Sequence, residues 1–444
     1  MHYEKFQDGT VKCIENEIPF ELPDGWSWAR LRDICMMSAG KSKSTVQIKS
    51  EPFEGSYPCF GGNGVRGYVD EYNQDGIFSI VGRQGALCGN INIAIGKFYA
   101  TEHAVVTTLF DGIDFKWSNY ILEALRLNNY ATGAAQPGLS VANILNVFVP
   151  VPPTQEQDRI GNSVYESLKI VEALEQEKID LQKNIITAKT KILDLAICGK
   201  LVPQDPNDEP ASVLLERIRA EKEELIKHGK IKRDKKESVI FKGDDNSYYE
   251  RVGDIISNID DEIPFELPQN WEWSRLQTIC YPITDGTHKT PTYSDSGYIF
   301  LSAKNITTGK INWNDIMYIP KSLHDELYSR VSPKMNDILL AKNGTTGVAA
   351  IVDRECEFDI YVTLALLRVV NNNISSQYLL KIIASGTIQD YFKSSLKGIG
   401  VPNLHLKHIR TTLIPIPPIN EQNKIAERIY QYYSLLDSIV QNIE

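Results

Sequence analysis

Two short glycine-rich phrases in the sequence look like catalytic motifs. Residues 60–64 read Phe-Gly-Gly-Asn-Gly, which matches the Phe-x-Gly-x-Gly loop of adenine methyltransferases. Those enzymes also use an Asn-Pro-Pro-aromatic phrase to hold the target amine, and the sequence contains none. Residues 40–42 read Gly-Lys-Ser, as at the end of a phosphate-binding loop, but Cys35 stands where the first glycine belongs. The first phrase is better explained as a hairpin turn, and the second does not predict an ATPase.

The seven histidines and seven cysteines form no metal-binding or nucleophilic pattern. No Cys-x-x-Cys phrase occurs, and the scattered, odd number of cysteines is typical of reduced thiols. We expect the histidines nearest to candidate loops to be surface or core groups rather than catalytic ones. They are His103, His288, His405 and His408. The sequence therefore predicts that the chain is not an enzyme and uses no metal or cofactor.

The chain contains one module twice, and the two ends of the module carry the repeat. Residues 17–23, Glu-Ile-Pro-Phe-Glu-Leu-Pro, recur unchanged at residues 262–268, and both copies continue into Trp-x-Trp-x-Arg-Leu. The closing phrase Pro-Val-Pro-Pro-x-x-Glu-Gln at 150–157 recurs with one change at 415–422. Residues 40–140 have no obvious counterpart in 284–405, an interval longer by about 20 residues. A constant frame around two variable inserts is typical of a recognition protein.

Each module is predicted to be mixed α+β. The residues that alternate or cluster as apolar runs between turn signals predict strands at 77–81, 104–109, 298–301, 337–340 and 363–369. Short helices are expected at 118–128 and 376–385. No apolar run is long enough for a membrane span, and the N-terminus lacks a signal pattern. We therefore expect a cytoplasmic protein.

A long helix with an apolar seam follows the first module. From residue 154 to 198 apolar residues recur at spacings of three, four or seven, which predicts a helix of about 65 Å that stops at Gly199. The end of the chain repeats the first half of this seam, so the two helices are expected to pair antiparallel. We expect the shorter C-terminal helix to leave the seam from Leu181 to Leu195 for partner subunits or a second copy of the chain.

The net charge of −10 argues against a uniformly basic DNA-binding surface. Any DNA face must be a local patch, or binding must be shared with more basic partners. The segment 203–245 contains an expected amphipathic helix at 211–226 and a basic run that is either a solvated linker or a contact to phosphate or a partner. The run comprises Lys227, Lys230, Lys232, Arg233, Lys235 and Lys236.

The repeated head and tail phrases, together with Gly-Lys-Leu-Val-Pro-Gln-Asp-Pro at 199–206, resemble the specificity subunit of type I restriction-modification systems over essentially the whole chain. The resemblance implies two target recognition domains, each reading one half of a bipartite double-stranded DNA target. It also implies antiparallel coiled-coil helices in a pseudo-symmetric repeat, which set the spacer and dock two methyltransferase subunits. Restriction subunits are further implied partners, and catalysis would belong to the partners.

The same resemblance marks candidate DNA-binding loops at 79–85, 284–291 and 340–347. Arginine and lysine can bind guanine, asparagine and glutamine can bind adenine, and glycine lets the backbone approach phosphate. The candidate residues are Lys41, Lys43, Arg66, Arg83, Gln84, His288, Lys289, Lys304, Lys342, Asn343 and Thr345.

These observations predict a division of the chain into five parts. We expect recognition domains at 1–152 and 248–417, a central helix at 153–199, a linker at 200–247 and a C-terminal helix at 418–444. The alternative is a protein of a different class, a non-catalytic scaffold whose two variable modules bind proteins rather than DNA. The sequence does not give the recognised bases.

Overall fold

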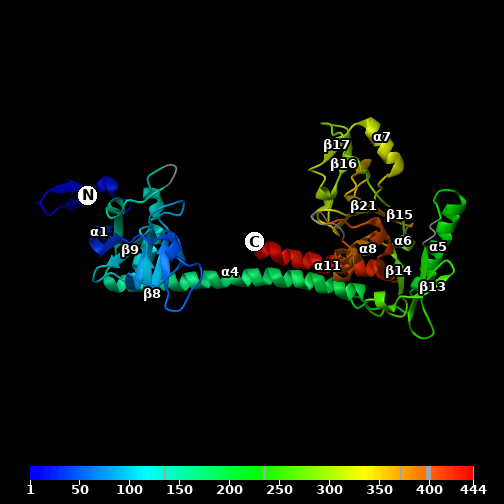
Figure 1. Cartoon of the computed structure of the whole chain (residues 1–444), viewed down its shortest axis with the longest axis horizontal. Coiled ribbons are helices and arrows are strands. Elements are labelled where there is room, and N and C mark those ends of the chain that lie inside the picture. The colour runs from blue at the N-terminus through cyan, green and yellow to red at the C-terminus, as the bar shows by residue number, and fades with distance from the viewer. Residues whose placement is uncertain (134–136, 234–236, 371–372, 397–401, 444) are drawn as a thin grey trace. The chain divides into compact units, whose positions relative to one another are not determined.

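The computed structural model describes residues 1–133, 137–233, 237–370, 373–396 and 402–443 (Figure 1). The chain divides into two compact units, Met1–Glu177 and Lys178–Glu444, and each contains one of the predicted modules. Helix α4 (Thr154–Ile197) runs from the first unit into the second. Among the described residues, no helix is both long and apolar enough to cross a membrane.

The first unit is built on a six-stranded sheet with the order β4-β9-β7-β8-β5-β6. Its strands are β4 (Cys35–Ala39), β5 (Tyr57–Gly61), β6 (Gly64–Val69), β7 (Gln74–Gly82), β8 (Ile91–Ala100) and β9 (Ala104–Leu109). Helix α2 (Phe115–Ala124) buries Trp117 and Leu122 in one apolar cluster with Val81 and Val105 of the sheet. The remaining elements are β1 (Tyr3–Lys5), β2 (Val11–Cys13), β3 (Ser27–Arg30), β10 (Phe148–Val151), α1 (Leu31–Ile34), α3 (Val141–Ile144), and the 3₁₀ turns η1 (Glu15–Glu17), η2 (Thr45–Gln47) and η3 (Leu127–Tyr130).

The second unit contains two smaller sheets, ordered β15-β21-β18-β19 and β17-β16-β20. Their strands are β15 (Cys280–Asp285), β16 (Tyr298–Leu301), β17 (Met317–Ile319), β18 (Ile338–Ala341), β19 (Ala349–Ile351), β20 (Phe358–Ile360) and β21 (Leu364–Val369). Tyr378 and Ile382 of α8 (Ser376–Ile383) are buried with Leu340 and Leu367. The other helices are α5 (Ala211–Lys227), α6 (Leu276–Ile279), α7 (Lys321–Arg330), α9 (Gly386–Ser394), α10 (Leu406–Thr411), α11 (Ile419–Ile443), and the turns η4 (Asp260–Glu262) and η5 (Ala303–Ile306). The predicted α+β class is confirmed.

A further three-stranded sheet lies at the expected end of the linker. Strands β11 (Ser238–Lys242), β12 (Tyr248–Val252) and β13 (Ile255–Asn258) form it, with β11 paired to β12. The sheet therefore spans the boundary expected between residues 247 and 248. Because a hydrogen-bonded sheet belongs to one folded body, we propose to end the linker before Ser238.

The strand pairing makes the two inserts equivalent, although their sequences are not alignable by eye. β9 pairs antiparallel with both β4 and β7, and β21 pairs antiparallel with both β15 and β18. A parallel pair follows in each unit, with Phe60 opposite Ala100 and Leu301 opposite Ile360. The inserts thus differ in side chains and lengths but repeat one scheme of strands.

One close backbone contact is also repeated. A Cβ atom on Gly40 would lie 2.1 Å from the Ala100 carbonyl oxygen, and one on Gly286 would lie 1.9 Å from that of Ile360. Both distances are far below van der Waals contact, so only glycine fits at either place. Gly40, which resembled part of a phosphate-binding loop, is therefore explained by packing.

The repeated head and tail phrases form one frame by pairing with each other. β3 pairs with β10, and β14 (Glu272–Arg275) pairs with β22 (Leu413–Ile416), which places Trp28 opposite Pro150 and Trp273 opposite Pro415. Trp273 is buried, whereas Trp28 is half-buried. The next arginine of each head then donates to a carbonyl four residues before the tail phrase, from Arg30 to Asn146 and from Arg275 to Thr411.

The glutamine of each tail phrase attaches the long helix to its module. Gln157 Oε1 accepts from the Asp114 N–H at the start of α2, and Gln422 Oε1 accepts from the Ser375 N–H at the start of α8. Each amide nitrogen donates in turn to a proline carbonyl of its own tail, that of Pro152 or Pro417. The repeated Glu-Gln phrase therefore satisfies backbone groups in both units.

Helix α11 pairs with the second half of α4, so the expected position of the uncovered seam is wrong. The Tyr433 hydroxyl donates to the Lys189 carbonyl at 2.9 Å, and Lys189 also forms an ion pair with Asp437. Ile185 and Leu193 of α4 are buried there. Antiparallel pairing places the start of α11 beside the end of α4, so the covered half is the later one.

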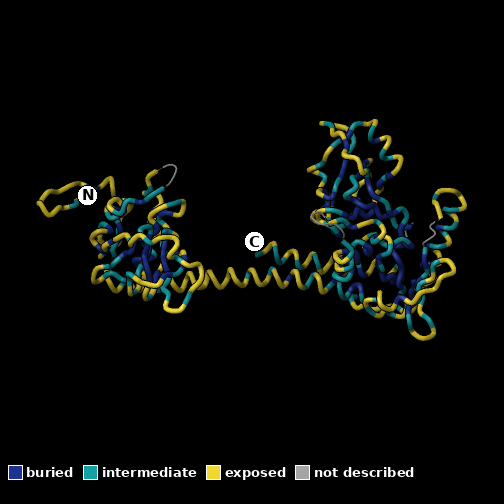
Figure 2. Tube along the Cα trace, in the orientation of Figure 1, coloured by how far each residue is buried: buried dark blue, intermediate teal, exposed yellow. Residues whose placement is uncertain are grey.

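The uncovered part of the seam lies earlier in α4. Every residue from 165 to 177 is exposed, including Leu168 at 44%, Val171 at 48% and Leu174 at 59% (Figure 2). We call Leu168, Val171 and Leu174 the open seam. Burying such a stripe is favourable, so the open seam is the part of α4 suited to contact with another chain.

Candidate nucleic-acid interface

In the first unit, separate segments meet just after β7. The Arg83 N–H donates to the His103 carbonyl at 2.9 Å, and the Leu139 N–H donates to the Arg83 carbonyl at 2.8 Å. Gln84 forms a bridge with Gly138. An open hollow of about 400 Å³ lies here, lined in part by the side chains of Arg83, Gln84 and His103. Arg83 and Gln84 are both exposed, so the fold presents them together.

The other predicted residues of the first unit do not all remain available to a ligand. Lys41 and Arg66 are exposed, and neither forms an ion pair with a described residue. Lys43 Nζ instead lies 2.6 Å from Glu71 and 3.7 Å from Asp70, with its side chain only 7% exposed. The hydrogen bond to Glu71 raises the pKa of Lys43. This pairing makes Lys43 less available to a ligand than Lys41 or Arg66, and its contact with DNA stays a prediction.

Lys342 occupies the same main-chain position in the second unit as Arg83 in the first. Its N–H donates to the Thr363 carbonyl at 2.8 Å, and its carbonyl accepts from the Leu404 N–H at 2.9 Å. The side chain differs, because it is 4% exposed and its ammonium donates to Asp285 Oδ2. Lys342 would have to break a buried ion pair to reach a base. We therefore propose that Lys342 positions this loop through Asp285 rather than contacting a base directly.

The loop after Lys342 presents the remaining candidates of the second unit. Asn343 is half-buried and forms a bridge with Asn403, and Thr345 is exposed. His288 is exposed, with Nε2 3.4 Å from Asp285 Oδ1, and Lys289 beside it is exposed as well. Asp285 therefore links the 284–291 loop to Lys342.

Lys304 joins the same group through the backbone. It is exposed on η5, and the adjacent Ala303 N–H donates to Thr363 Oγ1 at 3.1 Å. Thr363 is also the residue whose carbonyl accepts from Lys342. Three loops of the second unit thus converge, as they do in the first.

Sequence reasoning missed the segments that complete these loops from the far end of each insert. They are Gly138 with Ser140 in the first unit and Asn403 with His405 in the second. Ser140 and His405 precede α3 and α10, and each accepts a backbone hydrogen bond from that helix. A usable signal was present, since Gly138 and Asn403 precede their tail phrases by the same number of residues.

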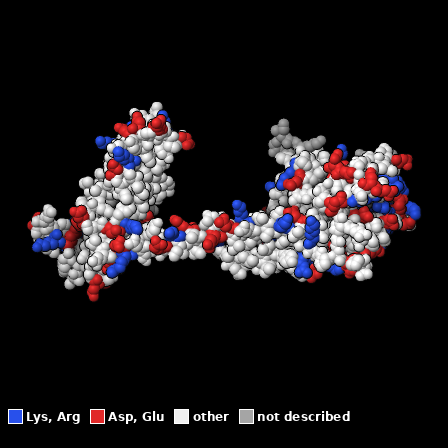
Figure 3. All heavy atoms as spheres, turned by 90° about the horizontal axis from the view of Figure 1, so that it is seen from below, with Lys and Arg blue, Asp and Glu red and all other residues white. Residues whose placement is uncertain are grey.

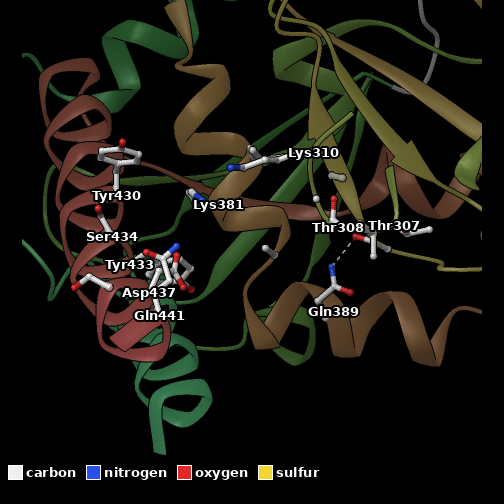
Figure 4. Close-up of a pocket in the computed structure, with 17 residues that line it drawn as sticks. Thr307, Thr308, Lys310, Lys381, Gln389, Tyr430, Tyr433, Ser434, Asp437 and Gln441 are labelled. Atoms are coloured by element: carbon white, nitrogen blue, oxygen red, sulfur yellow. Dashed lines mark hydrogen bonds between the residues drawn. The ribbon is translucent and has the colours of Figure 1, made fainter. Parts of the chain in front are cut away.

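A groove of about 870 Å³ lies in the second unit between α8, α11 and two loops. Figure 4 shows Lys310 and Lys381 extending toward α11, which contributes Tyr430, Tyr433 and Asp437. Burial, helped by the nearby Lys310, lowers the pKa of Lys381, and burial raises the pKa of Tyr433 to about 12. The groove thus brings Lys310, from a loop, and Lys381, from α8, beside the aromatic side chains of α11.

Two residues of the basic run in the linker form ion pairs within the chain. Lys227 pairs with Glu224 and Arg233 pairs with Glu223. Lys230 and Lys232 are exposed, and Lys235 and Lys236 lie outside the described residues. Figure 3 shows acidic and basic side chains intermixed over the second unit, so the charge on that face gives no broad basic surface.

Comparison with known proteins gives one consistent result. The family model described as the type I restriction modification DNA specificity domain matches residues 23–191 and 268–444. The specificity subunit of the type I restriction enzyme EcoAI from Escherichia coli is 26% identical over 96% of this chain and 80% of that protein. The specificity subunit of the type I restriction enzyme EcoprrI, also from Escherichia coli, is 42% identical over 38% of this chain and 43% of that protein.

Solved structures share the fold at low sequence identity. The HsdS subunit from Thermoanaerobacter tengcongensis has a TM-score of 0.54 and 14% identity, covering 97% of this chain and 94% of that one. A chain from a structure on complex assembly and conformational transition of the type I R-M system has a TM-score of 0.55 and 14% identity. The match covers 96% of this chain and 94% of that one.

Proposed function

This chain belongs to the type I restriction modification DNA specificity family, and we propose that it is the DNA-recognition subunit of such a system. Each module reads one half of a bipartite double-stranded target. The helices set the spacer and dock two methyltransferase subunits, and restriction subunits join that complex. The chain supplies no catalytic group, metal or cofactor of its own, and it acts in the cytoplasm, where its DNA target lies.

One observation carries this proposal. The two modules repeat the same main-chain hydrogen bonds around Arg83 and Lys342, yet they present different exposed side chains from the surrounding loops. Main-chain bonds hold a loop in place without using its side chains. Two similar supports with different surface chemistry suit the reading of two different half-sites.

We assign the exposed candidates and the half-buried Asn343 to DNA contact, and the ion-paired lysines to support. In the first module, Lys41, Arg66, Arg83 and Gln84 face the duplex, and in the second module His288, Lys289, Lys304, Asn343 and Thr345 do so. Lys43 and Lys342 hold loops through their ion pairs. Local exposed cations reconcile DNA binding with the net charge of −10, because phosphate contacts need only local positive charge.

The open seam and the groove beside α11 support docking of partner subunits on the helices. The open seam offers apolar side chains that no described residue covers, and the groove offers Lys310, Lys381 and Tyr430. Protein interfaces combine an apolar core that often includes aromatic side chains with a polar rim, which suits the open seam, Tyr430 and the two lysines respectively. We retain the proposed domain limits, except that the linker ends before Ser238.

The test uses the chain co-expressed with its methyltransferase subunit and a pool of random duplexes. We expect the complex to enrich a bipartite sequence, with an affinity that falls as salt rises. Exchanging residues 36–149 for the insert of another family member should change one half of that sequence only. A change in both halves would contradict independent modules.

The rival function is a scaffold whose modules bind proteins, and the net charge of −10 is the observation that favours it. The same experiment separates the two. Salt-insensitive binding to a protein partner, with no enrichment of any duplex, would support the scaffold and reject DNA recognition.

A further inference from the structure

A cation, a carboxamide and a glycine stand in the same order after the equivalent strands of the two modules. β7 is followed by Arg83, Gln84 and Gly85, and β18 is followed by Lys342, Asn343 and Gly344. The two glycines have positive φ angles of 95° and 76°, which is the backbone conformation that favours glycine. The turn therefore holds Gln84 and Asn343 at matching points of their modules.

The bridges formed by these two residues confirm the match. Gln84 bridges Gly138 and Asn343 bridges Asn403, each in antiparallel fashion. Beside Gln84 the Gly85 N–H donates to the Pro137 carbonyl and the Leu139 N–H to the Arg83 carbonyl, and beside Asn343 the Leu404 N–H donates to the Lys342 carbonyl. None of these bonds involves a carboxamide. The Cα position of a side chain on such a support is fixed, and a group that reads a base needs a fixed position.

The carboxamides themselves remain unused within the protein. Gln84 is exposed and lines the open hollow, and Asn343 is half-buried. Neither carboxamide forms a side-chain hydrogen bond with any described residue. Each keeps one acceptor and two donors, whereas the cations before them have diverged into an exposed Arg83 and an ion-paired Lys342.

We propose that Gln84 and Asn343 are matched specificity residues, and that each reads an adenine in the major groove of its own half-site. An amide oxygen accepts from adenine N6 while the amide nitrogen donates to N7, a pair of bonds that no other base offers in the same arrangement. This inference rests on the proposed function. It adds which side chain of each module reads an adenine.

The experiment compares single variants in the complete complex with its methyltransferase subunits. The wild-type target is first determined from a random duplex pool, and each target position is then varied in turn. We expect Gln84→Ala to reduce the preference for adenine at one position of one half-site by about 5- to 150-fold, equivalent to about 1–3 kcal/mol. Asn343→Ala should do the same at one position of the other half-site.

A substitution that alters the bonding pattern sharpens the result. Gln84→Glu replaces the amide by a carboxylate that only accepts, so the preference at that position should move from adenine toward cytosine, whose N4 amine donates. The matched control is Gln155→Ala, which removes an exposed carboxamide from the first turn of α4 and should change no position.

Two outcomes would overturn the inference while leaving DNA recognition intact. One is an unchanged preference at every position in both alanine variants. The other is an equal loss of affinity for all sequences, which would identify phosphate contacts. If the wild-type complex prefers no sequence at all, the proposed function itself fails, and that result is distinguishable from the other two.

Discussion

The ammonium group of Lys342 is buried against the carboxylate of Asp285, while the equivalent Arg83 extends from the surface of the other module. Removing one partner of a buried ion pair leaves the other charge without compensation. We expect Lys342→Ala to lower the free energy of unfolding of the second unit by about 3–5 kcal/mol. Chemical denaturation with a probe in that unit measures the loss.

Arg83→Ala is the matched control for this prediction, because it removes a cation from the same main-chain position without breaking an ion pair. Its effect on stability should be within about 0.5 kcal/mol, as for other surface sites. If both variants are equally stable, Lys342 does not support its loop, and the expectation of direct DNA contact regains its place.

The tail glutamines should contribute measurably to the attachment of the long helices. Gln422 is fully buried and bonded to the Ser375 N–H and the Pro417 carbonyl. Gln422→Ala leaves both groups without a partner, so we expect a cost of about 1–3 kcal/mol for each group that water cannot reach. The exposed Gln155 serves again as a control in urea denaturation, and an equal, small effect at both positions would argue against the attachment.

The repeated tryptophans should contribute different amounts to the free energy of unfolding of their units. Trp273 is 1% exposed and packs on Phe265 at a ring distance of 5.1 Å, while the half-buried Trp28 packs on Phe20 at 5.0 Å. Trp273→Ala should cost about 3–5 kcal/mol, and Trp28→Ala less, because it removes less buried surface. Neither should alter the DNA sequence that is recognised. A folded variant with a new target would show that the head phrase reads DNA.

Charges placed in the open seam should disrupt assembly and not folding. Leu168→Glu together with Leu174→Glu changes residues that are already exposed, so the midpoint of unfolding should stay nearly constant. Contact with a methyltransferase subunit or a second copy would bury those charges and should weaken. Sedimentation of the variant with and without the methyltransferase subunit measures both associations. If the variant still binds the methyltransferase subunit and a second copy as well as the wild type does, the open seam is not an interface.

The length of α4 should set the spacing of the two half-sites. Inserting one heptad after Ile179 adds about 10 Å of helix, which corresponds to about three base pairs, and keeps the seam roughly in phase. The insertion point precedes the segment of α4 that contacts Tyr433 and Asp437 of α11, so that pairing should survive. Mapping the target of the variant complex should reveal a longer spacer between unchanged halves. An active complex with the original spacer would exclude the helix as the ruler.

Elements with strong local signals were predicted closely from the sequence. Strands β9 and β16 have the expected limits, and the long seam gave α4 to within one residue of its end. The helices α7 and α9 were not predicted, because most of their residues are polar. The repeat predicted the order of the two frames and the two long helices. It did not predict how the strands within the inserts pair.

The sequence identified the loops of the candidate site but could not tell which of their residues contact DNA and which support the loop. Arg83 and Lys342 look alike in the sequence, and the difference between them depends on Asp285, which lies 57 residues before Lys342. Lys43 is similarly neutralised by Glu71. Such pairs form only when the chain folds, so residue type alone could not separate a contact from a support.

The repeated backbone around Arg83 and Lys342 has a consequence for how such a protein can change over time. Each loop there is tied by N–H and carbonyl groups, which every substitution except proline retains. An exposed residue on that support can therefore be replaced with little penalty to folding. New DNA preferences can then arise by one or a few mutations, or by exchange of a whole insert, without the chain passing through an unfolded ancestor.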